Sequence, residues 1–152
     1  MVPAGSSAIL YQGLSALPVF NPDDDRDPVP ATVAELRELI RQADAVLFST
    51  PEYAGTLPGS FKNLLDRTGG SDVVSEKPVA WINVAVPGRG YGAIAALASA
   101  LVHIDARVLH RACIEFPIAR DIVDCGLIAT RPERDALARW WTAMQDQPET
   151  HD

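Results

Sequence analysis

Two short segments of the sequence concentrate glycine, proline and tyrosine, the residue types expected in loops that bind a ligand through their backbone. They are residues 50–57 and residues 87–92, and each follows an apolar run of the strand type. Glycine lets the backbone approach a ligand closely, while proline stiffens the turn. In parallel α/β sheets, ligands bind beyond the carboxyl ends of the strands. We therefore predict that both segments line one binding site.

Other residues with reactive side chains lie in patterns that do not favour a metal site. The acidic run at residues 23–27 is typical of a solvated surface turn, which we prefer to a metal site as its interpretation. His103 and His110 have no cysteine or histidine at metal-ligand spacing. We therefore predict satisfied or solvated imidazoles and no bound metal.

The remaining candidates have plain structural interpretations. Cys113 and Cys125 are most simply small apolar side chains, with redox thiols of low pKa as the open alternative. Lys62 and Asn63 could contact a substrate, but exposed positions on a helix are the commoner interpretation. None of these residues is predicted to be catalytic.

Alternating strand and helix patterns must position the two loops. Thr32 followed by Glu35 predicts a capping box at a helix start, and an uncharged run at residues 45–49 predicts a strand buried on both faces. In chain order, the predicted elements are a strand at 8–11, a solvated loop at 18–30, a helix at 32–43, the strand at 45–49, a helix from Pro58 to Gly69, a strand at 78–86, a helix to about residue 105, a strand at 107–109, an irregular segment at 116–130 and a last helix from Pro132, anchored by Trp140 and Trp141.

This alternation predicts the fold class. Each helix between two strands returns the chain to start the next strand in the same direction, so we expect an α/β fold with a parallel sheet. The length of 152 residues suits a single domain over residues 1–152, with a mobile tail at 147–152.

The composition excludes several classes of protein. A net charge of −7 repels phosphate backbones and anionic lipid heads, so neither nucleic acid nor a membrane is an expected partner. Two cysteines cannot form a disulfide framework, and no window reaches the ~20 apolar residues of a spanning helix. The first seven residues lack the basic and apolar regions of a signal peptide. We therefore expect a cytoplasmic protein.

Residues 49–66 carry a more specific pattern, STPEYAGTLPGSFKNLLD. This segment resembles the signature of the NADPH-dependent FMN reductase family, which has a flavodoxin-like fold. The segments PGRGYG at 87–92, YQGL at 11–14 and LPVFNPD at 17–23 are also similar to segments of that family. The resemblance extends from about residue 8 to the last helix.

The resemblance implies a three-layer α/β/α fold and a site that binds FMN and NADPH or NADH. It implies that both loops position the isoalloxazine ring. The residues implied are Pro51, Glu52, Tyr53, Ala54 and Gly55 in the first loop and Pro87, Gly88, Gly90, Tyr91 and Gly92 in the second. Because the flavin itself performs the hydride and electron chemistry, no catalytic residue is expected, and Glu52 should cap or pair within its turn. The resemblance also implies a homodimer or homotetramer, with Tyr53 near the ring or at a dimer contact.

The sequence departs from the family pattern at several places. Family members often have Asn where this chain has Ala54, and many have Trp where it has Arg67. They also open with a strand, a phosphate-cradling G-S-x-R loop and a helix, and residues 5–7 do not fit that loop. The missing strand would be the central one of the order 2-1-3-4-5. Without the cradle, each lost charge-assisted hydrogen bond costs roughly 1.5–3 kcal/mol, so FMN affinity should fall by orders of magnitude.

Three explanations for this apparent N-terminal truncation stay open. We favour a start codon placed too late, because an unfilled slot in the sheet would leave backbone groups unpaired. The alternatives are a shortened paralogue that pairs its remaining strands directly and a partner chain that fills the gap.

Two functional hypotheses follow. In the first, the protein is a flavoprotein oxidoreductase in which a nicotinamide cofactor delivers hydride to FMN, and the flavin passes electrons to a small acceptor such as a flavin or quinone. In the second, it is a flavin-free paralogue that acts as an interaction module or is inactive.

Overall fold

The computed structural model describes residues 5–118, 123–124, 127–128 and 131–145. The chain divides into two compact units, one formed by Tyr11–Pro117 and the other by Met1–Leu10 with Ile118–Asp152. The predicted mobile tail and Cys125 lie outside the described residues. The single domain over residues 1–152 stays a prediction.

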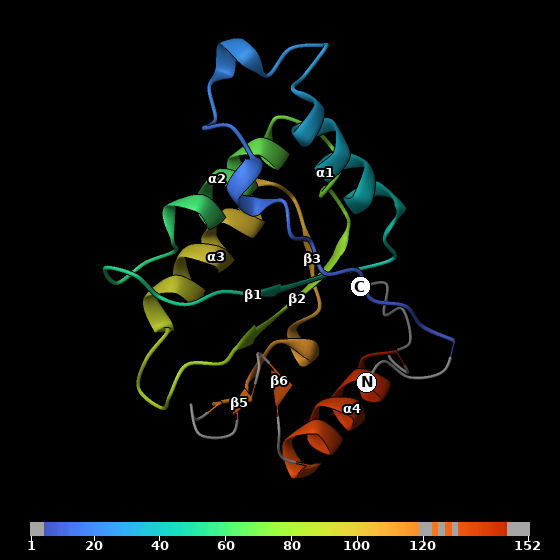
Figure 1. Cartoon of the computed structure of the whole chain (residues 1–152), viewed down its shortest axis with the longest axis vertical. Coiled ribbons are helices and arrows are strands. Elements are labelled where there is room, and N and C mark those ends of the chain that lie inside the picture. The colour runs from blue at the N-terminus through green and yellow to red at the C-terminus, as the bar shows by residue number, and fades with distance from the viewer. Residues whose placement is uncertain (1–4, 119–122, 125–126, 129–130, 146–152) are drawn as a thin grey trace. The chain divides into compact units, whose positions relative to one another are not determined.

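The unit formed by Tyr11–Pro117 is built on a small parallel sheet (Figure 1). Its first two strands, β1 (Val46–Ser49) and β2 (Pro78–Asn83), pair along their length. β2 also pairs with β3 (Arg107–Val108) and, further along, with β4 (Ile114–Glu115). Every one of these pairings is parallel, which confirms the predicted α/β fold.

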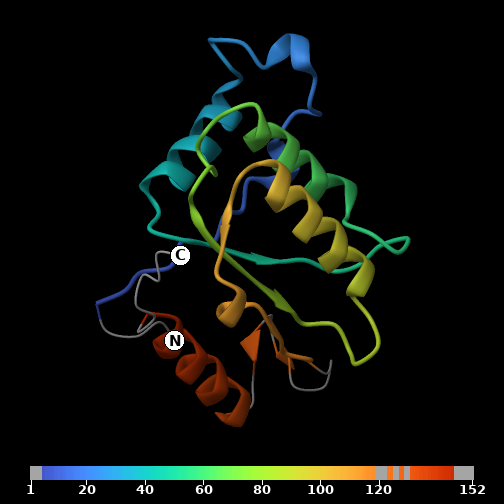
Figure 2. The ribbon, with the colours of Figure 1, turned by 180° about the vertical axis from the view of Figure 1, so that it is seen from behind.

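Three helices accompany this sheet, α1 (Ala31–Gln42), α2 (Gly59–Gly69) and α3 (Tyr91–His103). Seen from behind, α2 and α3 cover one face of the sheet (Figure 2). Their apolar stripes, with that of α1, form one core with the strands; its members include Val33, Leu36, Phe48, Phe61, Leu64, Val79, Leu97 and Leu101. Short 3-10 turns lie at Leu14–Ala16, Pro22–Asp24 and His110–Ala112. The predicted helices therefore all form.

The predicted capping box of α1 is wrong. The helix begins at Ala31, and Pro30 is the N-cap residue without a side-chain cap. Thr32 therefore lies inside the first turn, where its hydroxyl cannot act as the N-cap. The fixed φ of Pro30 sets the entry to the helix instead.

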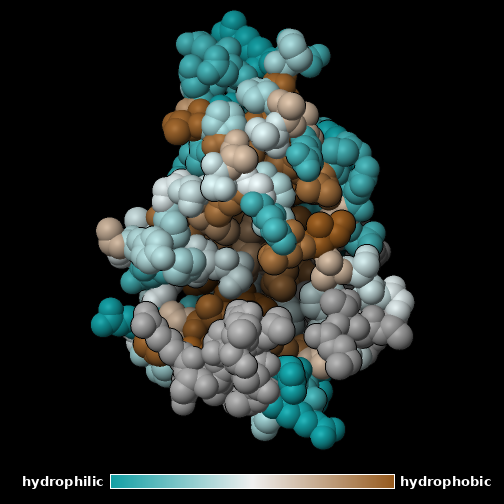
Figure 3. Space-filling view, in the orientation of Figure 1, coloured by the Kyte–Doolittle hydropathy of each residue, from teal (hydrophilic) through white to brown (hydrophobic). Residues whose placement is uncertain are grey.

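β1 is buried on one face only, contrary to the prediction of two buried faces. Phe48 faces the core with 6% of its surface exposed, whereas Leu47 is 38% exposed and Ser49 is also exposed. Apolar side chains gather over β1 and β2 on the face turned toward the viewer in Figure 3. Among the described strands, β1 pairs with β2 alone; its other edge, which no described strand pairs with, is called the free edge below.

The strand predicted at residues 8–11 does not form. A strand is stable only where a neighbour satisfies its backbone N–H and C=O groups. No described strand pairs with residues 8–11, so the apolar pattern alone is not sufficient to make them extended sheet.

The second unit contains short elements that the sequence did not indicate. β5 (Val123–Asp124) and β6 (Leu127–Ile128) form an antiparallel pair where we predicted an irregular segment. The last helix, α4 (Arg131–Gln145), forms as predicted, and the rings of Trp140 and Trp141 pack edge to face at 6.2 Å. In the part of the chain that is described, no helix is long and apolar enough to cross a membrane.

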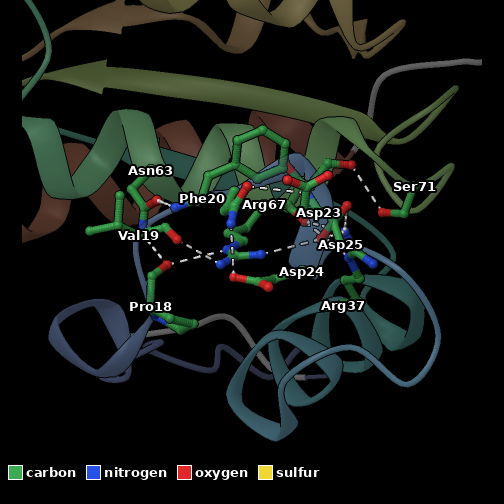
Figure 4. A network of polar contacts seen from close by, with 12 residues as sticks. Pro18, Val19, Phe20, Asp23, Asp24, Asp25, Arg37, Asn63, Arg67 and Ser71 are labelled. Carbon is green, nitrogen blue, oxygen red and sulfur yellow. Dashed lines mark hydrogen bonds and ion pairs between the residues drawn. The ribbon is translucent and has the colours of Figure 1, made fainter.

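A buried ion cluster ties the loop before α1 to two helices (Figure 4). Asp25 accepts hydrogen bonds at 2.9 and 2.8 Å from Nη2 of Arg37, and Nη1 of Arg67 lies 3.5 Å away. The side chains of Asp25, Arg37 and Arg67 are only 6%, 11% and 1% exposed. The solvated turn predicted for the acidic run is therefore wrong at Asp25, whose charge is needed to balance the two guanidinium groups.

Arg67 and Asn63 also hold the preceding residues of this loop. Arg67 donates to the carbonyl oxygens of Pro18 and Val19, at 3.2 and 2.7 Å, and its guanidinium lies 5.4 Å from the centre of the Phe20 ring. Asn63 accepts from the Phe20 amide at 2.7 Å and donates to the Pro18 carbonyl at 3.0 Å. Asn63 is thus a structural anchor, not the exposed helix position that we predicted.

Substituting Asp25 tests whether this cluster holds the loop. Asp25→Ala leaves two buried guanidinium groups without their counter-charge, so we expect a loss of about 3–5 kcal/mol in the free energy of unfolding, measured by urea denaturation. Asp23→Ala is the control, because Asp23 and Arg26 form a surface ion pair with side chains 84% and 79% exposed. Equal effects of the two substitutions would contradict the assignment.

Candidate functional site

The first loop forms a tight hairpin turn after β1. Tyr53 and Thr56 exchange two backbone hydrogen bonds, each 3.0 Å long. The residues between them, Ala54 and Gly55, have φ angles of 49° and 75°, as a type I′ turn requires. Glycine adopts this left-handed conformation freely, whereas alanine in the same conformation costs roughly 1–2 kcal/mol. Asn tolerates this conformation better than Ala, which is a physical reason for the Asn that the resemblance implies at the position of Ala54.

The second loop is supported from inside by Asn83 at the end of β2. This side chain is 3% exposed, accepts from the amide of Ala85 at 3.1 Å and donates to the carbonyl of Arg89 at 3.2 Å. Gly90 then turns the chain into α3 with φ of 87°, and a Cβ there would lie 2.5 Å from the Asn83 oxygen. Asn83 is not among the site residues predicted from the sequence; the signal for it was a polar residue within the predicted strand at 78–86.

The two loops meet at Glu52. One carboxylate oxygen, Oε2, accepts hydrogen bonds from the backbone amides of Gly92 at 2.7 Å and Ala93 at 3.3 Å. The backbones are so close that a Cβ on Gly92 would overlap the carbonyl oxygen of Gly55. Glu52 in the first loop therefore caps α3, the helix that follows the second loop. The prediction that Glu52 would cap or pair within its own turn is wrong.

Most of the other predicted site residues form an exposed surface on these loops. Tyr53 and Tyr91 are 64% and 55% exposed. A Cβ added at Gly55 or Gly88 would meet nothing within 4 Å, so the backbone there faces open space. The exposed predicted residues are Pro51, Tyr53, Ala54, Gly55, Pro87, Gly88 and Tyr91, whereas Glu52 and Gly92 are half-buried and Gly90 is buried.

Comparison with known proteins assigns this arrangement to a family. The sequence profile of the NADPH-dependent FMN reductases matches residues 8–121. The chain belongs to the NADPH-dependent FMN reductase family.

Two relatives illustrate how far the similarity reaches. A quinone reductase from Pseudomonas putida is 37% identical over 119 residues, which make up 75% of this chain and 61% of that protein. An NAD(P)H-dependent FMN reductase from Pseudomonas aeruginosa is 31% identical over 151 residues, or 95% of this chain and 80% of that protein. The chain thus spans about three fifths of the length of the quinone reductase that it matches.

A solved structure shows the same fold. FerB, a flavoenzyme NAD(P)H:(acceptor) oxidoreductase from Paracoccus denitrificans, superposes with a TM-score of 0.67 and 28% sequence identity, covering 88% of this chain and 75% of FerB. The α/β fold with its parallel sheet is therefore flavodoxin-like, as the resemblance implied.

The surroundings of Cys113 do not favour a thiol of low pKa. Burial raises the pKa of Cys113 above its ordinary value, although a backbone hydrogen bond from Trp81 opposes this effect. Its Sγ donates to the carbonyl of Leu109 at 3.4 Å. The alternative of a low-pKa thiol is thus wrong for Cys113. Within the described ranges, no group of three or more His, Cys, Asp or Glu residues could hold a metal ion.

Gly90→Ala tests the conformation of the second loop. Alanine at this position must keep a left-handed backbone conformation, and its Cβ must displace the side chain of Asn83. We therefore expect a loss of about 2 kcal/mol in the free energy of unfolding. Gly59→Ala is the matched control at the start of α2, where a Cβ meets nothing within 4 Å. A neutral or slightly stabilising effect is expected for that control. A neutral effect of Gly90→Ala would contradict the loop geometry.

Proposed function

We propose that the protein binds FMN with its isoalloxazine ring against the two loops and uses NADPH or NADH to reduce it. The observation that supports this most strongly is the junction at Glu52, which joins the hairpin turn after β1 to the start of α3. Three of the residues that the family resemblance implies for ring binding, Glu52, Gly55 and Gly92, lie against one another at this junction. The flavin, when bound, supplies the hydride and electron transfer.

The described residues fit a flat aromatic ligand. Open space beside Gly55 and Gly88 lets a ring approach the backbone, whose N–H and C=O groups suit the polar edge of isoalloxazine. Tyr53 and Tyr91 are exposed and offer aromatic surface for stacking. The Glu52 carboxylate is engaged by the α3 amides, so we assign it no proton transfer.

The phosphate of FMN has to be held elsewhere in this proposal. The N-terminus of α3 would suit an anion, but the Glu52 carboxylate already accepts its amides and would repel a phosphate. We propose that the strand and phosphate-cradling loop of the family pair with the free edge of β1. Residues 8–11 form no strand, so the described residues give no support to direct pairing of the remaining strands, one of the three explanations. In this proposal, a segment encoded upstream or a partner chain would supply that unit.

We further propose that the electron acceptor is a quinone or a second flavin. The support is the similarity to proteins named quinone reductase and NAD(P)H-dependent FMN reductase. A homodimer or homotetramer is part of the proposal, with exposed Tyr53 next to the ring or at the subunit contact.

Titration of the purified chain with FMN and with riboflavin tests the proposal. Binding should quench the flavin fluorescence, and riboflavin should bind about as well as FMN because the proposed site contacts the ring and not the phosphate. Tyr53→Ala should weaken both by roughly tenfold through lost stacking. Val102→Ala, at an exposed residue of α3, is the control. NADPH should then bleach the bound flavin anaerobically, and a quinone should restore its colour.

A longer chain, translated from the codons upstream of Met1 as well, tests the explanations for the apparent N-terminal truncation. If those codons supply the phosphate loop, FMN should bind that chain at least a hundredfold more tightly than riboflavin does, since two charge-assisted hydrogen bonds suffice for that ratio. A chain that quenches neither flavin at any concentration would overturn the enzyme proposal and favour the flavin-free interaction module.

A further inference from the structure

We propose that Glu52 is a positioning residue that makes the two ring-binding loops move as one body. The relevance to flavin rests on the proposed function, whereas the mechanical coupling rests on contacts within the protein itself. The carboxylate belongs to the loop after β1, and the groups that it binds belong to the helix after β2.

The start of α3 needs an acceptor that its own sequence does not provide. The first amides of a helix have no partner inside the helix, and a Ser, Thr, Asp or Asn at the N-cap normally accepts from them. Here the N-cap is Gly90, which has no side chain. Glu52, 40 residues earlier, accepts from Gly92 instead, and its charge lies favourably at the positive end of the helix dipole.

The contact also depends on the residue type at position 92. A Cβ there would overlap the Gly55 carbonyl oxygen and lie 2.9 Å from Oε2 of Glu52. Glycine at this position therefore lets the hairpin turn lie directly on the first turn of α3. The close backbone approach and the carboxylate cap act at the same place, so displacement of either loop breaks both.

Asn83 and Glu52 have separate tasks in this arrangement. Asn83 holds the second loop to the end of β2 through Ala85 and Arg89. Glu52 joins the two loops to each other. A ring that contacts both loops needs their spacing fixed before it binds, because ordering a loose site costs binding free energy.

Hydrogen exchange of the flavin-free chain, measured by NMR, tests the coupling directly. In Glu52→Ala, the amides of Gly92 and Ala93 should exchange at least tenfold faster, and so should those of Tyr53 and Thr56 in the other loop. Glu52→Gln keeps an acceptor oxygen but loses the charge, so it should restore part of the protection. Glu38→Gln is the matched control, because Glu38 is exposed on α1 and contacts Arg41 and Gln42.

The outcomes separate this inference from the proposed function. Unchanged exchange at Tyr53 and Thr56 in Glu52→Ala would overturn the coupling, and so would an equal acceleration at Val79 in the core, which would indicate general destabilisation. If the unmodified chain binds FMN, Glu52→Ala should weaken that binding about tenfold and Glu52→Gln less. If it binds no flavin, the proposed function fails while the exchange rates still decide the coupling.

Discussion

The parallel pairing of β1 with β2 is the constraint on which the rest of the structure depends. Parallel strands end at the same edge of a sheet, so the turns that follow β1 and β2 start side by side although they are about 40 residues apart in the chain. The shared direction of β1 and β2 brings the two turns close. The Glu52 carboxylate and the absence of a side chain at Gly92 then bring them into contact. The candidate site is a consequence of strand direction, refined by one helix cap.

The opposite end of the same unit is stabilised by charge. Arg67 is fully buried on α2, and its guanidinium binds two loop carbonyls while Asp25 supplies a counter-charge. A buried guanidinium is tolerated only when its donors and its charge are satisfied together. These polar contacts fix the loop at residues 18–25 to α1 and α2. A large apolar side chain in place of Arg67 would have to fix the loop by packing alone.

The free edge and exposed face of β1 connect the fold to the proposed binding of FMN. Leu47 points away from the core and β1 has a neighbour on one side only among the described strands. The same edge is where the proposed phosphate-binding unit belongs. In the proposed function, ring binding and phosphate binding are therefore separable, because the two loops proposed to face the ring contact each other without that unit.

The sequence by itself determined the α/β class, the helices and the two loops, because apolar periodicity, prolines and glycines act locally. The helix predicted from Pro58 to Gly69 forms over Gly59–Gly69, with Pro58 as its N-cap. The motif at residues 49–66 determined the family. Tertiary structure alone decided which polar residues are buried and what they bind. In the sequence Asp25 is indistinguishable from the acidic residues beside it, but in the structure arginines from two different helices contact it. Asn63 binds the loop at residues 18–20, and Glu52 binds amides that follow the other loop. Tertiary structure also decided that residues 8–11 form no strand, since strand formation requires a neighbour that no local pattern can supply.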